Sequence, residues 1–133
     1  MGIILDTNVL IHAERNPGTV NFDIWSDFGE AFITAVTCSE LLVGVHKANT
    51  RTRRIKRAAF VEAIISAFSI LEFDLDTARA HAEIVAAIPR NITLDAHDAM
   101  IAASAIRFGH HLLTGNIADF RKIPGLQLVK FPV

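Results

Sequence analysis

Five short apolar segments alternate with longer segments of helical pattern along the whole chain. Short strands separated by helices are typical of a parallel sheet, because parallel neighbours need a long crossover connection and a helix usually supplies it. The sequence therefore predicts an α/β fold, a three-layer α/β/α sandwich with a mostly parallel central sheet. The predicted strands are residues 2–5, 32–35, 70–73, 111–114 and 127–131.

Capping residues and apolar spacing place the helices between these strands. Thr37 and Glu40 have the spacing of a capping box, with Thr37 as the N-cap and Glu40 at position N3. Asp95 is the predicted N-cap of a strongly apolar helix over residues 96–107, which ends at Gly109. The helix that begins after the third strand is predicted to turn four residues inward: Ala78, Ala82, Val85 and Ala86.

Length and composition favour one folded domain over residues 1–133. The chain is 51% hydrophobic, and its mean hydropathy of +0.36 excludes a disordered protein. A single cysteine allows no internal disulfide, which fits a reducing compartment. Neither a signal peptide nor an apolar run near the roughly 20 residues of a membrane helix is evident. A cytoplasmic protein without a membrane contact is therefore expected.

The net charge of −1 conceals an uneven distribution. Six of the thirteen basic residues lie within residues 47–57, where there is no acid, so seven bases face fourteen acids elsewhere. This basic segment favours contact with phosphates over a merely solvated helix face, because it lacks the interleaved acids of a salt-bridged helix. Docking of an acidic partner segment is the alternative. The predicted RNA contacts are Arg51, Arg53, Arg54 and Arg57.

Acidic residues follow three of the predicted strands, where the ligand crevices of open α/β sheets form. Carboxylates brought together from such distant positions repel one another unless cations intervene, and oxygen ligands of this kind suit Mg²⁺ or Mn²⁺. Helix capping explains each residue singly, but it does not require acids after three different strands. Common nucleotide-binding and hydrolase motifs are absent. The acids concerned are Asp6, Glu40, Asp98 and Asp119, and the amide residue Asn116 lies close to Asp119 in the sequence.

Four segments carry a resemblance to a known family: residues 4–11 (ILDTNVLI), 37–44 (TCSELLVG), 98–105 (DAMIAASA) and 113–120 (LTGNIADF). In this order and spacing they resemble the PIN-domain ribonucleases, specifically the VapC toxins of toxin-antitoxin systems. The resemblance implies a Mg²⁺-dependent endoribonuclease, with Mn²⁺ as a substitute, that leaves 5′-phosphate and 3′-hydroxyl ends on RNA. It also implies a homodimer and a cognate antitoxin that blocks the acidic pocket.

The resemblance further implies roles for individual residues. Asp6, Glu40 and Asp98 would hold the metal. Asn116 stands where relatives commonly have Asp, which leaves Asp119 as the nearby fourth carboxylate of the catalytic set. Three polar residues would orient the carboxylates, as such sites generally require: Asn8, Thr114 and Asn116.

Two residues beside the predicted pocket are not expected to bind the metal. Asp95 is predicted to be a plain N-cap, and His97 is predicted to point away from the pocket.

Two other functions remain open. One is a phosphoryl-transfer domain of the phosphatase or receiver type, disfavoured by Asn8 and by the absence of a lysine after Thr114. The other is a non-catalytic PIN-like binding module, which the substitution at Asn116 makes plausible.

Overall fold

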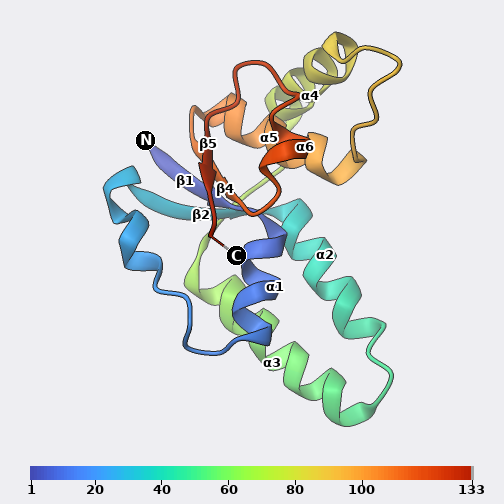
Figure 1. Ribbon diagram of the computed structural model, residues 1–133. Coiled ribbons are helices and arrows are strands. Elements are labelled where there is room, and N and C mark those ends of the chain that lie inside the picture. Colours follow the sequence, from blue (N-terminus) through green and yellow to red (C-terminus); the bar gives the residue numbers. More distant parts are fainter. Residues whose placement is uncertain (133) are drawn as a thin grey trace.

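The computed structural model describes residues 1–132, and its centre is one parallel sheet (Figure 1). Every strand pair is parallel, and the order across the sheet is β3-β2-β1-β4-β5, so the first strand of the chain is the central one. The predicted domain ends at Val133, which lies outside the described residues. The strands are β1 (Gly2–Leu5), β2 (Glu30–Thr34), β3 (Ser69–Leu71), β4 (His111–Thr114) and β5 (Leu128–Lys130).

Helices cover both faces of the sheet, which confirms the predicted three-layer α/β architecture (Figure 1). One face carries α1 (Thr7–Arg15), the 3₁₀ helix η1 (Phe22–Phe28), α2 (Ala35–His46) and α3 (Arg51–Ala67). The other face carries α4 (Leu75–Ala87), α5 (Ala96–Phe108) and α6 (Ile117–Phe120). None of the helices in the described part of the chain is both long and apolar enough to cross a membrane.

Alternation along the central strands divides the interior into two cores. Ile3 and Leu5 of β1 pack with α1, α2 and α3, whereas Ile4 packs with α4 and α5. In β4, Leu113 belongs to the same core as Ile3 and Leu5, and Leu112 belongs to the same core as Ile4. Successive side chains of a strand point to opposite faces, so a continuous apolar strand buries both faces at once.

The start of α2 differs from the predicted capping box. Thr34, the last residue of β2, is the N-cap, and its hydroxyl accepts a hydrogen bond from the Thr37 N–H at 3.1 Å. Thr34 has the extended backbone that an N-cap needs, so the strand passes into the helix without a loop. The prediction that Thr37 is the N-cap, with Glu40 at N3, was therefore wrong, and the Glu40 carboxylate lies in the second turn of α2.

The predicted inner side of α4 was also wrong. Ala82, Val85 and Ala86 are exposed, while Thr77 and Ile84 are buried. Alanines occur all round this helix, so their spacing does not identify the face that packs. Ile84 is large enough to reach the core beside α5, which leaves apolar side chains of α4 on the open side of the molecule.

The sheet topology brings several chain segments to the same edge. β1 and β4 are neighbours, and both run toward the starts of the helices that follow them. Asp6 is the N-cap of α1, Asp95 is the N-cap of α5, and Asn116 precedes α6. The carboxyl edge of the sheet is therefore surrounded by helix N-termini that carry acidic and amide side chains.

Candidate active site

Asp6 is the most firmly held carboxylate at this edge. Its side chain is only 4% exposed, and its Oδ1 accepts a hydrogen bond from the Thr7 N–H at 2.8 Å. The Thr114 hydroxyl donates to the other oxygen, Oδ2, at 2.7 Å. Burial raises the pKa of Asp6, while these two hydrogen bonds oppose that effect.

Thr114 connects Asp6 with two asparagines. Its hydroxyl oxygen accepts from the backbone N–H of Asn116 at 2.9 Å and from Asn8 Nδ2 at 3.5 Å. Asn8 Oδ1 in turn accepts from the N–H of Gly115 at 3.3 Å. The residues predicted to orient the carboxylates therefore lie around Asp6, although Asn116 contributes its backbone rather than its side chain at this point.

Glu40 has a partner on each carboxylate oxygen. The Thr7 hydroxyl lies 2.8 Å from Oε1, and His97 Nδ1 lies 3.5 Å from Oε2. The prediction that His97 points away from the pocket was wrong, because the second residue of α5 faces α2. Neither contact has a signal in the sequence, since both join helices that are distant along the chain.

Asp98 differs from the other two acids because no hydrogen bond to its carboxylate occurs within residues 1–132. Asp95 caps the helix as predicted and accepts the Asp98 backbone N–H at 3.0 Å. Burial, followed by repulsion from neighbouring acids, raises the pKa of the Asp98 carboxyl to about 7. The repelling charges are those of Asp6, Asp95, Glu40 and Asp119.

Asp119 is already paired on both oxygens. Asn116 Nδ2 donates to Oδ2 at 2.7 Å, and Lys122 Nζ lies 3.6 Å from Oδ1. The Asn116 side chain makes no capping hydrogen bond to α6 and is instead committed to Asp119. This fourth carboxylate is therefore the most nearly neutralised member of the cluster.

The chemistry of the donors fits a hard divalent cation. Asp6, Glu40 and Asp98 offer carboxylate oxygens, and the raised pKa of Asp98 reflects negative charge that the surrounding side chains leave uncompensated. No three acidic, histidine or cysteine side chains of residues 1–132 lie close enough to enclose a metal ion in the present arrangement. The carboxylates therefore form an open cluster rather than a closed cage.

Two adjoining grooves extend from Glu40 along α1 and α3. The first, of about 120 Å³, is lined by Glu40 together with Glu14 and Arg57, and the second, of about 340 Å³, shares those last two residues. Arg57 bridges them, with its Nε 3.4 Å from Glu14 Oε1. The second groove continues to Arg53, Lys56 and Phe60.

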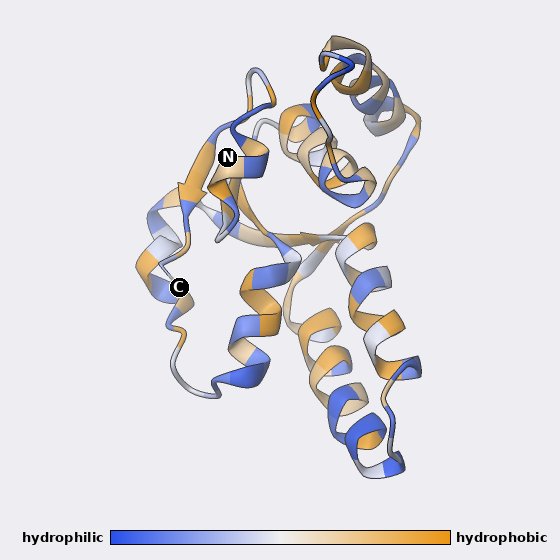
Figure 2. Cartoon of the chain, turned by 45° about the vertical axis from the view of Figure 1, so that its right-hand side comes forward, coloured by the Kyte–Doolittle hydropathy of each residue, from blue (hydrophilic) through white to orange (hydrophobic). Residues whose placement is uncertain are grey.

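The predicted RNA-contact residues occupy different positions relative to these grooves. Arg53 and Arg57 line them, whereas Arg51 and Arg54 are not among the lining residues. Arg57 also donates to the Gly44 carbonyl at 3.0 Å, so part of its hydrogen-bonding capacity serves the α2–α3 contact. The end of α3 that carries these arginines is hydrophilic and lies away from the sheet (Figure 2).

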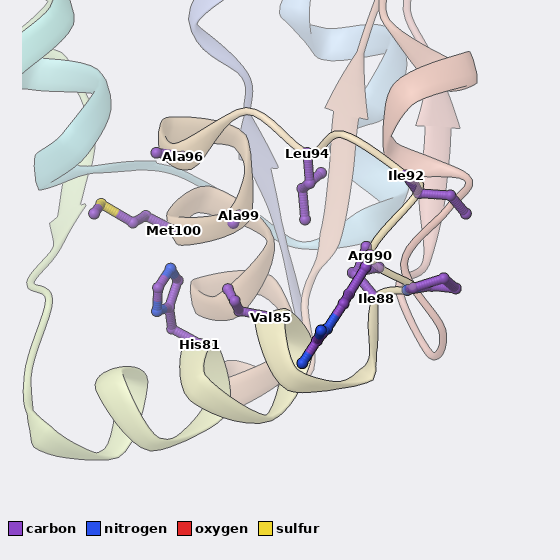
Figure 3. Close-up of a pocket in the computed structure, with 10 residues that line it drawn as sticks. His81, Val85, Ile88, Arg90, Ile92, Leu94, Ala96, Ala99 and Met100 are labelled. Atoms are coloured by element: carbon purple, nitrogen blue, oxygen red, sulfur yellow. The ribbon is translucent and has the colours of Figure 1, made fainter.

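A third cavity, of about 490 Å³, lies between α4, α5 and the loop that joins them (Figure 3). Its wall is mainly apolar and includes Val85 of α4 and Met100 of α5. It contains none of the residues predicted for the site.

The sequence matches the PIN domain family over residues 3–126. It is 41% identical to Ribonuclease VapC1 of Rickettsia felis over 130 residues, which are 97% of this chain and 96% of that protein. It is 30% identical to the tRNA(fMet)-specific endonuclease VapC of Salmonella typhimurium, over 94% of both chains. The crystal structure of DNA-bound VapBC from Salmonella typhimurium has a similar chain, with a TM-score of 0.87, 27% identity and 98% coverage of both chains.

Proposed function

The chain belongs to the PIN-domain family and is a toxin endoribonuclease of the VapC type, and we propose that Asp6, Glu40 and Asp98 hold the divalent cation for its reaction. The observation that carries this assignment is the Asp98 carboxylate, which lies among like charges and lacks a hydrogen-bond partner within residues 1–132. Membership of this family replaces the alternative of a phosphatase or receiver-like domain.

Mg²⁺ is the proposed cation, with Mn²⁺ as a substitute, because both accept hard oxygen donors and leave positions for water. Such a cation supplies a more acidic water and stabilises charge that develops on a phosphodiester. The hydrogen bonds from Thr7 and Thr114 favour the ionised form of Asp6 and so oppose the effect of burial, which raises its pKa. Because its pKa is about 7, the Asp98 carboxyl is partly protonated near neutral pH. It would lose this proton when a cation binds, and its negative charge would then contribute to holding the cation.

We assign Asp119 to the same site as its fourth carboxylate. Its negative charge is more fully neutralised by neighbouring side chains than the charges of the other three. Its charge is the smallest of the contributions that raise the pKa of Asp98, which supports a position of Asp119 near the same site. Lys122 and Asn116 hold the Asp119 carboxylate. We assign Asn116 the role of orienting this fourth carboxylate, in addition to bonding Thr114 through its backbone N–H.

The RNA strand is proposed to pass from the carboxylate cluster into the grooves beside α3. Arg53 and Lys56 line the second groove and are exposed, so they are available to phosphates. Phosphate contacts of this kind supply affinity without reading sequence. The basic side chains would balance the repulsion between the phosphate backbone and the acidic cluster.

An antitoxin is the expected protein partner, because a chain of VapBC-5 from Mycobacterium tuberculosis, a member of the VapBC family of toxin-antitoxin systems, has a similar structure. A homodimer is proposed to form through the open side of α4. Leu75 and Val85 of this helix are 66% and 50% exposed, and Val85 also lines the apolar cavity shown in Figure 3. Burial of such a surface against a second copy would remove apolar area from water.

The direct test compares the wild-type protein with Asp6→Asn on a panel of RNAs that includes tRNA(fMet). Cleavage is expected with Mg²⁺ or Mn²⁺, and not with chelator or with the variant. Asp23→Asn, which changes an exposed acid of η1, is the matched control and should cleave normally. An Asp6→Asn protein as active as wild type would overturn the proposed site. A wild-type protein that binds these RNAs without cleaving any would favour a non-catalytic binding module.

A further inference from the structure

Three threonine hydroxyls form a continuous chain that ends on Glu40. Thr34 Oγ1 lies 3.3 Å from Thr37 Oγ1, which lies 3.0 Å from Thr7 Oγ1, and Thr7 Oγ1 lies 2.8 Å from Glu40 Oε1. All three threonines are buried, with exposed fractions of 1%, 0% and 7%. They come from the end of β2, the first turn of α2 and the first turn of α1.

The carboxylate fixes the direction of this chain. An ionised Glu40 only accepts, so the single proton of the Thr7 hydroxyl is donated to Oε1. Thr7 must then accept from Thr37 rather than donate to it. Thr37 in turn accepts from Thr34, whose oxygen receives the backbone N–H of Thr37 at 3.1 Å and whose proton is free to be donated. Every hydroxyl proton points toward the carboxylate.

Such an arrangement restricts how Glu40 can rotate. A buried hydroxyl whose partner moves away loses its hydrogen bond and keeps the cost of its desolvation. Because the chain ends on Oε1, displacement of this oxygen leaves one buried hydroxyl proton of the chain without an acceptor, whichever way the hydroxyls then turn. Hydrogen bonds in a chain also polarise one another, which strengthens the bond to the charged end. Oε1 is thereby held, and Oε2 stays outside the hydroxyl chain, 3.5 Å from His97 Nδ1.

We propose that Thr7, supported by Thr37 and Thr34, is a positioning residue that presents the Glu40 carboxylate to the divalent cation. The inference rests on the proposed function to the extent that Glu40 is a cation ligand. Loss of a group that orients a metal ligand commonly weakens metal binding by about 10–100-fold.

The test measures Mn²⁺ affinity by electron paramagnetic resonance, and thermal unfolding of the same samples. Thr7→Val removes the hydroxyl and keeps the shape, Thr7→Ser restores the hydroxyl, and Thr37→Val breaks the second link. The matched control is Thr77→Val, which removes a fully buried hydroxyl that donates to Asp74 at 2.9 Å, remote from the cluster. Glu40→Gln reports whether Glu40 binds the cation at all.

The expected result is a 10–100-fold weaker Mn²⁺ affinity in Thr7→Val, a smaller loss in Thr37→Val, and affinities close to wild type in Thr7→Ser and Thr77→Val. Equal Mn²⁺ affinities in Thr7→Val and wild type, with a weakened Glu40→Gln, would overturn this inference and leave the proposed site intact. A Glu40→Gln protein that binds as tightly as wild type would overturn both. If Thr7→Val does not fold, unchanged affinity in Thr37→Val overturns the inference.

Discussion

Asp98 bears the largest electrostatic cost at the carboxyl edge of the sheet. Asp6 and Glu40 each receive hydrogen bonds from neighbouring side chains, whereas Asp98 receives none among residues 1–132. A carboxyl that is partly buried among like charges retains its proton to higher pH, and its pKa of about 7 follows from this difference. Folding without a cation is therefore opposed by ionisation of this one group.

The stability of the metal-free protein should depend on pH through Asp98. Its folded pKa of about 7 lies above the usual value of 3.8, so its contribution to stability is complete below pH 4 and is lost as pH rises through 7. Asp98→Asn should remove this loss and raise stability at pH 8 by about 1–2 kcal/mol, a figure reduced for solvent screening. Melting temperatures in chelator at pH 5 and pH 8 provide the measurement.

The gain in melting temperature of Asp98→Asn over wild type should be larger at pH 8 than at pH 5. Saturating Mg²⁺ at pH 8 should then stabilise wild type more than the variant, because ligand binding favours the folded state. An equal difference at both pH values would contradict the assignment of this effect to Asp98.

A further prediction concerns Asp95, because the substitution Asp95→Asn removes its charge and keeps its ability to cap the helix. Asparagine caps a helix as well as aspartate does, so Asp95→Asn should preserve the hydrogen bond to the Asp98 N–H and change stability by less than about 0.5 kcal/mol. Mn²⁺ affinity should fall much less than in Asp98→Asn. Comparable losses in the two variants would make Asp95 a cation ligand in addition to a cap.

Individual residues differ in how far their roles could be predicted from the sequence. Asp6 and Asp98 follow strands or begin a helix, so the topology alone places them at one edge. The contact of His97 with Glu40 depends on the rotation of α5 relative to α2, which no local pattern records. The hydroxyl chain from Thr34 to Thr7 has the same origin, since it joins three elements.

At the scale of elements, the apolar pattern identified the strands well. β1 and β4 have the predicted bounds, and β2, β3 and β5 differ from them by up to two residues at each end. The N-cap and the buried face of a helix were harder to predict where two residues or two faces fit the sequence pattern equally well. Thr34 and Thr37 both suit an N-cap, and the backbone at the end of β2 selects Thr34. The alanine-rich α4 has no single apolar side from which its packing could be predicted.

The basic residues of α3 that line the grooves should contribute more to RNA binding than those that lie outside them. In an Asp98→Asn background, Arg53→Gln with Lys56→Gln removes two groove-lining charges. For a single strand the slope of log affinity against log salt should become shallower by about 1.4, at roughly 0.7 per phosphate contact. The measurement is fluorescence anisotropy of a labelled RNA over a salt series.

The matched control for α3 is the pair Arg51→Gln and Arg54→Gln, which removes the same charge from residues outside the grooves. This pair should change the slope less. An equal reduction in both pairs would show that the end of the helix, rather than the groove, contacts phosphate.

At the scale of the whole molecule, the two faces of the sheet have different surroundings. The face with α1, α2 and α3 bears the grooves that lead from Glu40. The face with α4 and α5 bears the apolar cavity and the exposed side of α4. The proposed RNA path and the proposed dimer contact therefore occupy opposite layers and do not compete.

Val85→Glu should dissociate the proposed dimer. A carboxylate placed in an apolar contact must be desolvated, so the dimer dissociation constant should rise by at least about 100-fold, or about 2.7 kcal/mol. Sedimentation equilibrium measures this change. Ile24→Glu on η1 is the control, because Ile24 is 63% exposed and lies on the other layer. A wild-type protein that is monomeric at high concentration would refute the proposed contact.

The central position of β1 has a consequence for the order in which the protein becomes active. Asp6 is synthesised well before its hydroxyl partner Thr114, which lies 108 positions later in the chain. The residues of β2 are synthesised before those of β4, so β1 can pair along only one of its edges until β4 has been made. A nascent chain therefore carries the acidic residues of a nuclease without the arrangement that organises them. The edge of the sheet that holds Asp6 in place is therefore completed only after β4 has been synthesised.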